Sequence, residues 1–554
     1  MADVVLDRVI WALDRPLTYR VPQHLQGTLG VGSIVRVPLR GRRLRGWVVE
    51  VREANEAPET LMQVVSVSGS APIFDEALLS ALGQMAHRYV QPLASFLRLV
   101  TPGRMGPPAA TGDIPEAVAP SGDGLPLRTL RRLAPREDPL GIYVDLIGQG
   151  LRRGRGAIVV VPEVGDEAAL LRRLQESFPE EAAVVHSGRS PAERAAALWS
   201  VARGERRVVL GSRAAVLAPS LPLGAVIVHQ EHDRSLKETR APYYDSREVA
   251  AARAAATGAS LLLASRTPSV SSWHRAGRGW EVVEPPAAAR REGWPVIEAV
   301  EPAHGGRSGA VLPQRIIAAV LEARRGREPV LILMLRARAT PAGPGPREVA
   351  AYLARALPEA RVTAERPGDV IVSTRAPAEG EDPAIRTAVA VGVDAVLERA
   401  AGRAAEEGFA TLWGLASGIA RSSPRGRVLV ETRDPRHHAI QALTRADYGY
   451  FLRRELEVRR QSGSPPFSAL IRLRIGAPGG RRGGDPEEVL GASDDLVERL
   501  EGLSGTEVLG PMEGRRGAEI LLKVEDREKV LVPLRALVSS SRDGVLVEMD
   551  PPDW

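Results

Sequence analysis

A chain of 554 residues is long enough for about three or four domains, and its 44% hydrophobic content suffices for buried cores. The absence of cysteine excludes disulfide bonds and cysteine-ligated zinc, and it fits a cytoplasmic protein. The 74 basic and 68 acidic residues give a net charge of +6, a modest excess that permits nucleic-acid binding. No apolar run approaches a membrane span, and the first residues lack the pattern of a secretory signal.

Residues 1–102 have the pattern of a compact, β-rich domain. A short strand at 15–22 is bounded by prolines, and strands at 33–38 and 45–51 flank a basic tip in a hairpin-like arrangement. Five arginines lie between positions 36 and 45. Such a cluster either forms a solvated loop or contacts phosphate groups. The candidate arginines for DNA contact are Arg15, Arg36, Arg40, Arg42 and Arg43.

The next segment, residues 103–138, is rich in proline and glycine and is predicted to be a linker. A short basic helix is expected within it at 127–133. From residue 139 onward, helix and strand patterns alternate, which predicts parallel α/β lobes. A first lobe is expected over residues 139–300 and a second over 301–455.

The remainder of the chain predicts one long charged helix and a small terminal domain. The helix is expected at residues 438–461. Residues 456–554 follow a β-α-β-β-α-β order, which suggests a small ferredoxin-like or split-sheet α+β domain.

Within the first lobe, residues 224–228 read as a buried parallel strand that runs directly into polar residues. Ligands bind beyond the carboxyl ends of such strands in open α/β sheets. Motor ATPases place an Asp-Glu pair there, to hold Mg²⁺ and to orient the attacking water. Here the two positions hold His229 and Gln230.

The lysines of the chain exclude a Walker A motif. A phosphate-loop lysine must follow Gly-x-x-x-x-Gly. None of the three lysines does so; they are Lys237, Lys523 and Lys529.

Several short strings occur in one order along almost the whole chain, among them 15–19, 211–215, 231–233, 242–248 and 267–269. Together they resemble the primosomal protein N-prime (PriA) family of replication-restart helicases. The resemblance implies an N-terminal domain that captures a 3′ DNA end, a winged helix, two RecA-like lobes, a zinc insertion and a C-terminal domain. It also implies fork DNA and other primosome and replisome proteins as partners.

The first lobe departs from the family at the positions that would bind ATP. With Tyr143 as the point of alignment, Pro139 stands at the phosphate-loop lysine. His229 replaces the Mg²⁺ ligand and Gln230 the catalytic glutamate, whereas Glu231 is retained. A neutral histidine is a poor ligand for Mg²⁺, because that ion prefers hard oxygen ligands.

The second lobe departs in the same direction. Gly418 takes the place of the family's first arginine in the Gln-Val-Ala-Gly-Arg box, and Arg421 keeps the second. Loss of an arginine finger costs roughly 10³–10⁵ in rate. Arg266 stands where the family has alanine. The segment 335–369, where the zinc insertion belongs, has no cysteine, and the linker is too short for a complete winged helix.

Two N-terminal residues bear on capture of a 3′ end. The family has an acidic residue before a tyrosine, and here Thr18 precedes Tyr19. A hydroxyl still hydrogen-bonds a base or a sugar, although with weaker acceptance. Tyr19 either stacks on a base, which is worth roughly 1–3 kcal/mol, or packs at the edge of the core.

We therefore expect a multidomain α/β protein with a β-rich N-terminal domain, two RecA-like lobes of the superfamily 2 type and a small α+β C-terminal domain. We expect no ATP, Mg²⁺ or zinc cofactor and no catalytic residue. The function expected is replication restart through binding of stalled or branched fork DNA, without helicase activity. Two alternatives stay open. One is a divergent ATP-dependent 3′–5′ helicase using Glu231, His232 and Arg421, and the other is a replisome scaffold that binds no DNA.

Overall fold

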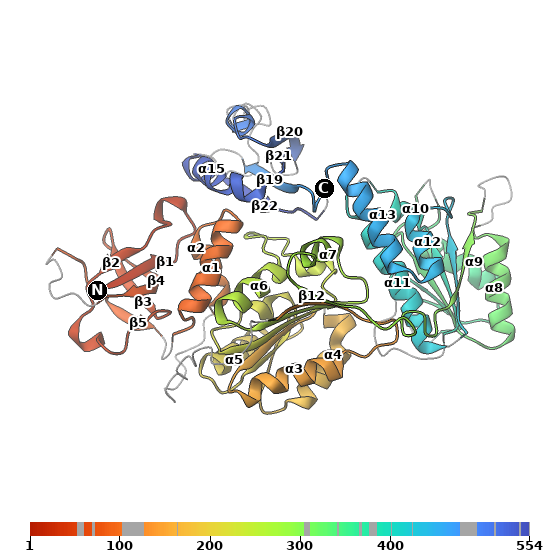
Figure 1. Cartoon of the computed structure of the whole chain (residues 1–554), viewed down its shortest axis with the longest axis horizontal. Coiled ribbons are helices and arrows are strands. Elements are labelled where there is room, and N and C mark those ends of the chain that lie inside the picture. The colour runs from red at the N-terminus through yellow and green to blue at the C-terminus, as the bar shows by residue number, and fades with distance from the viewer. Residues whose placement is uncertain are drawn as a thin grey trace. The chain divides into compact units, whose positions relative to one another are not determined.

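A computed structural model of the protein (Figure 1) divides the chain into two compact units. The first unit comprises Met1–Thr129, Leu140–Leu263 and Phe467–Pro551, and the second comprises Leu130–Pro139, Ala264–Pro466 and Pro552–Trp554. The structure describes residues 1–52, 60–68, 72–101, 127–162, 164–303, 311–340, 343–364, 368–375, 385–399, 402–423, 425–476, 496–514, 517–541 and 544–552.

The N-terminal domain is a five-stranded sheet of order β2-β1-β4-β3-β5, followed by two helices (Figure 1). Alternate residues of the strands, such as Val4, Val35 and Val48, point into one apolar core. On the opposite face, the indole of Trp47 donates to the Thr101 hydroxyl just beyond the second helix (3.0 Å). The elements are β1 (Ala2–Leu6), β2 (Leu17–Tyr19), β3 (Ile34–Leu39), β4 (Arg42–Val51), β5 (Ser66–Ser68), α1 (Glu76–Arg88) and α2 (Leu93–Val100).

The first lobe contains a seven-stranded sheet of order β12-β6-β11-β10-β7-β9-β8. Strands β10, β7, β9 and β8 pair in parallel, and β7 and β9 are buried throughout because helices cover the sheet. The strands are β6 (Arg128–Arg132), β7 (Gly156–Val160), β8 (Ala182–Val185), β9 (Val208–Gly211), β10 (Leu223–His229), β11 (Ser260–Ser265) and β12 (Glu281–Val283). The helices are α3 (Leu140–Arg152), α4 (Val164–Ser177), α5 (Pro191–Ala202), α6 (Ser246–Thr257) and α7 (Val270–Ala276).

The second lobe is a six-stranded sheet of order β13-β18-β17-β14-β16-β15, and all its neighbouring strands are parallel. Two apolar clusters cover its faces, one around Phe409 and Trp413 and the other around Ile316 and Leu353. The strands are β13 (Val296–Val300), β14 (Val330–Met334), β15 (Val362–Thr363), β16 (Val370–Ser373), β17 (Thr387–Val391) and β18 (Arg427–Glu431). The helices are α8 (Gln314–Arg325), α9 (Pro346–Ala356), α10 (Asp394–Leu397), α11 (Ala404–Ser422), α12 (His438–Arg445) and α13 (Tyr448–Gln461).

The C-terminal domain is an antiparallel four-stranded sheet of order β20-β21-β19-β22. With a helical stretch at 496–501 and helix α15 between its strands, it has the β-α-β-β-α-β order predicted from the sequence. The elements are β19 (Ala469–Gly476), β20 (Thr506–Gly514), β21 (Gly517–Val524), α15 (Arg527–Ser540) and β22 (Val545–Met549).

The fold class expected from the sequence is therefore present: a β-rich N-terminal domain, two RecA-like parallel lobes and a small α+β domain. Among the helices in the described ranges, none is both long enough and apolar enough to cross a bilayer.

Several local expectations need correction. The basic segment 127–133 is not a helix, because β6 extends along β11 and joins the sheet. Of the linker expected at 103–138, residues 103–126 lie outside the described residues. The boundary expected at residue 300 is misplaced, because β13 pairs with β18 in the second lobe. The helix expected at 438–461 is two helices, separated at Ala446 by a left-handed backbone (φ 52°).

Candidate functional site

The strand that ends in the candidate motor site is β10, which lies between β7 and β11 at the centre of the first lobe. Its glycine is required by close packing, since a Cβ on Gly224 would lie 2.9 Å from the Cα of Gly150 in α3. His229 ends the strand and is fully buried. The next residue, Gln230, has a left-handed backbone (φ 46°), so the chain turns sharply at the carboxyl end of the strand.

His229 and helix α3 are in direct contact. The hydroxyl of Tyr143 and Nδ1 of His229 lie 2.7 Å apart and share one hydrogen bond, and the two rings meet edge to face. Both side chains are fully buried. The structure therefore places an imidazole and a phenol together at the strand end where motor ATPases have a carboxylate.

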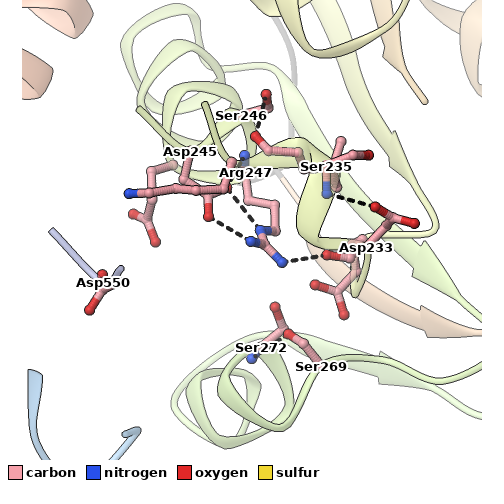
Figure 2. A network of polar contacts seen from close by, with 12 residues as sticks. Asp233, Ser235, Asp245, Ser246, Arg247, Ser269, Ser272 and Asp550 are labelled. Atoms are coloured by element: carbon pink, nitrogen blue, oxygen red, sulfur yellow. Dashed lines mark hydrogen bonds and ion pairs between the residues drawn. The ribbon is translucent and has the colours of Figure 1, made fainter. Parts of the chain in front are cut away.

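The retained acid, Glu231, is fully buried, and its backbone carbonyl accepts a 2.6 Å hydrogen bond from Arg247. Arg247 also forms a bidentate ion pair with Asp245 at 2.8 and 2.6 Å (Figure 2). Burial alone would raise the pKa of Asp245, but Arg247 and Lys237 outweigh burial and hold this pKa well below its usual range. Glu231 therefore lies beside a buried ion pair that orders the start of α6, which Asp245 caps.

The residues after Glu231 also build local structure. The carboxylate of Asp233 accepts from the backbone N–H of Ser235 at 2.7 Å and caps a short 3₁₀ turn (Arg234–Leu236) (Figure 2). In the part of the chain that the structure describes, no group of three or more acidic or histidine side chains is placed to hold a metal ion.

The segment Leu130–Pro139, which ends at the candidate residue Pro139, belongs to the second unit. The carbonyl of Pro135 accepts hydrogen bonds from Arg266 Nε (3.3 Å) and from Arg421 Nη1 (3.1 Å). Arg266 Nη2 also donates to the carbonyl of Glu137 at 2.9 Å. We call Arg266 and Arg421 the arginine pair. A phosphate cradle presents backbone N–H groups, whereas this segment presents carbonyl oxygens to two guanidinium groups.

Helix α11 carries both candidate residues of the second lobe. Arg421 lies in its last turn, where it reaches Pro135. Gly418 lies one turn earlier, and apart from the neighbouring backbone of its own helix no described heavy atom lies within 4 Å of the place that a Cβ would occupy. Glycine is therefore not required at this position by packing.

The N-terminal candidates separate into two groups. Thr18 donates to the carboxylate of Asp3 at 2.7 Å. The ring of Tyr19 is 1% exposed and packs in the domain core, and its hydroxyl donates to the carbonyl of Pro38 at 3.2 Å. Burial raises the pKa of this phenol. The base-stacking role considered for Tyr19 does not agree with this buried position, and the core packing considered beside it does.

The candidate arginines are all exposed, which leaves them accessible to a ligand. Arg36 and Arg43 lie on the face of the β3–β4 hairpin opposite the core, while Arg40 and Arg42 lie at its tip. Arg36 and Arg43 do not share a face with Tyr19, which weakens the interpretation of the domain as a reader of a 3′ terminal base, whereas Arg42 lies opposite Leu39 on the core side of the hairpin. Arg15 lies just before β2.

Sequence reasoning missed the roles of several residues. Arg45 belongs to the same exposed face as Arg36, and the strand period gives the signal for it. Arg266 and Arg247 belong to the motif strings, but their contacts could not be predicted, because their partners lie 131 and 16 residues away in the chain.

Comparison with known proteins adds to this geometry. Residues 3–102 match a family model described as 3′DNA-binding domain (3′BD). The replication restart protein PriA of Synechocystis sp. is 26% identical over 505 residues, covering 74% of this chain and 60% of that protein. That of Treponema pallidum is 25% identical over 648 residues, covering 97% of both chains. This chain thus spans 60% of the length of the first relative.

A solved structure of RecG bound to a three-way DNA junction covers 60% of this chain and 44% of that chain, at a TM-score of 0.41 and 17% identity. This likeness adds nothing to the topology described above.

The chain has a helicase-like fold. Along the sequence, two RecA-like lobes with parallel strands follow an N-terminal region that matches a 3′DNA-binding domain. One of the relatives above aligns over 97% of this chain at 25% identity, so the chain is similar over nearly its whole length to the PriA replication restart proteins.

Proposed function

We propose that this protein acts in replication restart by binding stalled or branched fork DNA, and that it does so without hydrolysing ATP. Similarity to the PriA replication restart proteins and the match of residues 3–102 support the DNA-binding part. A basic excess with exposed arginines on the N-terminal domain suits a polyanionic partner. Other primosome and replisome proteins are proposed as further partners.

The arginine pair is the observation that supports DNA binding without ATP hydrolysis. A nucleotide phosphate needs N–H donors and a cation. Beside Pro135 the cations are already bonded to backbone carbonyls, and those carbonyls would repel a phosphate. The contact between Tyr143 and His229 supports the same proposal, because it fills the strand end with groups that Mg²⁺ does not favour as ligands.

The test is a binding titration of the full chain with a fork that carries a nascent 3′-OH, in the presence and absence of ATP and Mg²⁺. The expected dissociation constant is the same in both conditions within about twofold, and it rises steeply with salt. Phosphate release is measured on the same samples with single-stranded DNA added, and no release above the protein-free background is expected.

Each other outcome is informative. DNA-stimulated phosphate release would refute the ATP-independent proposal and favour the divergent helicase, and the Glu231→Gln variant would then show whether the retained acid takes part. Absence of binding to any DNA would refute the proposed function and favour a replisome scaffold.

A further inference from the structure

The β3–β4 hairpin of the N-terminal domain presents one basic face. Arg36 lies directly opposite Arg45, and Pro38 opposite Arg43, in the antiparallel register. Residues directly opposite share a face, and residues two apart on one strand share it too. Arg36, Arg43 and Arg45 therefore lie together, on the side away from Val37, which is buried in the core. We call these three arginines the basic face.

The turn fixes this arrangement. Arg40 and Gly41 both have a left-handed backbone (φ 45° and 75°), as a two-residue type I′ hairpin turn requires. A two-residue turn sets the register of the strands that it joins. The spacing of the arginines is therefore built into the hairpin, at about 7 Å between Arg43 and Arg45 along the strand. The exposed Arg40 and Arg42 extend the positive charge to the tip.

Within the described residues, the arginines of the basic face make no ion pair, in contrast to a neighbour on the same sheet. Arg52, just past the end of β4, pairs with Asp3 and Glu50. The guanidinium carbon of Arg45 lies over the ring of Trp47, at 5.9 Å from the ring centroid. Like charges directly opposite each other destabilise a sheet, so the pairing of Arg36 with Arg45 costs stability in the free protein. A bound polyanion would remove that cost.

We propose that the basic face binds the sugar-phosphate backbone of duplex DNA, independently of any 3′ end. This rests on the proposed function in taking DNA as the ligand. A two-stranded ribbon fits the major groove, and arginine makes charge-assisted, bidentate contacts with phosphate. Neither Thr18 nor Tyr19 contributes to this surface, because one is bonded to Asp3 and the other is buried.

The test uses the full chain and a closed dumbbell duplex, which has no free end. The variant replaces all three arginines of the basic face by glutamine. Loss of three phosphate contacts should weaken binding to the dumbbell by at least about tenfold and reduce the slope of log affinity against log salt by about 2 to 3. Thermal stability should stay equal or rise, because the repulsion between Arg36 and Arg45 is gone; this separates a binding defect from misfolding.

A matched control removes the same charge from arginines of the second unit that are already paired. Each is exposed and bonded to a glutamate, so little change in affinity is expected. The control substitutions are Arg315→Gln, Arg386→Gln and Arg454→Gln.

Four results would overturn the inference. If the variant bound the dumbbell as tightly as the unaltered chain, or if the control lost as much affinity, the basic face would not be the site. If the chain bound a fork with a 3′-OH but not the dumbbell, the domain would recognise the end; the proposed function would then stand without this inference. If no DNA of any form bound, the proposed function would fail as well.

Discussion

Arg459 lies at the centre of a buried ion network in the second unit. It is 2% exposed and bonds Glu406 and Glu455, at 2.8 Å to each. Glu406 also accepts the backbone N–H of Val270, the first residue of α7 (3.1 Å). The network thus joins α7, α11 and α13. The Arg459→Met change keeps the apolar bulk and removes from two buried carboxylates a counter-charge that they share.

The structure sets the magnitude of the effect. Burial would raise the pKa of Glu406, but Arg403 and Arg459 outweigh burial and lower it to about 2 from 4.5. That shift corresponds to about 3 kcal/mol of stabilisation of the ionised carboxylate. Removing one partner of a buried ion pair typically costs roughly 3–5 kcal/mol. We therefore expect Arg459→Met to lower the free energy of unfolding of the second unit by about 3 kcal/mol.

Hydrogen exchange of the full chain measures this change locally. Amides of α11 and α13 that exchange through global opening should exchange about a hundredfold faster in Arg459→Met at pH 7. The matched control is Arg454→Met on the same helix, where an exposed pair with Glu457 predicts less than about 0.5 kcal/mol. If both variants behaved alike, or if Arg459→Met lost less than about 1 kcal/mol, the reasoning would be refuted.

The same network predicts a pH dependence. The pKa of Glu406 is lower in the folded chain than in the unfolded chain, so its contribution is complete above about pH 4.5. It is lost as the pH falls toward about 2. Since Arg459→Met removes the charge that lowers this pKa, the variant should show a shallower loss of stability over that interval.

Three further predictions test the candidate sites. Gly418→Arg should fold normally, because no described heavy atom beyond the neighbouring backbone of its own helix lies within 4 Å of the new Cβ, and it should not bring ATP hydrolysis in a phosphate-release assay. Tyr143→Phe should lower the free energy of unfolding by about 1–3 kcal/mol in urea, because a buried nitrogen of His229 loses its partner. An unchanged urea midpoint would contradict this. Tyr19→Phe should cost about 1 kcal/mol, the bond to the Pro38 carbonyl, and should leave fork affinity unchanged; a loss of affinity without a loss of stability would restore a role for Tyr19 in binding.

Much of the fold could be predicted from local sequence pattern. Strands such as β7 and β10 are continuous apolar runs that end in polar residues, so they could be predicted as strands at the centre of a parallel sheet. The break between α12 and α13 could not be predicted, because Ala446 adopts a left-handed backbone that alanine does not favour. Strand β6 was predicted as a helix because the spacing of its arginines is more typical of one face of a helix than of a strand.

For the candidate site, the sequence predicted the positions of residues but not their contacts. The positions of His229, Gly418 and Arg421 followed from motif order. Their contacts did not, because Tyr143 lies 86 residues from His229 and Pro135 lies 286 residues from Arg421. Such pairings depend on packing of distant segments and leave no local signal.

The arginine pair also bears on how far the second unit depends on a ligand for its order. Arg266 and Arg421 donate hydrogen bonds to backbone carbonyls of their own unit, so the segment Leu130–Pro139 is held in place by the chain itself. Replacing Arg266 by the alanine that stands there in the family would remove two of these three bonds and leave the one from Arg421.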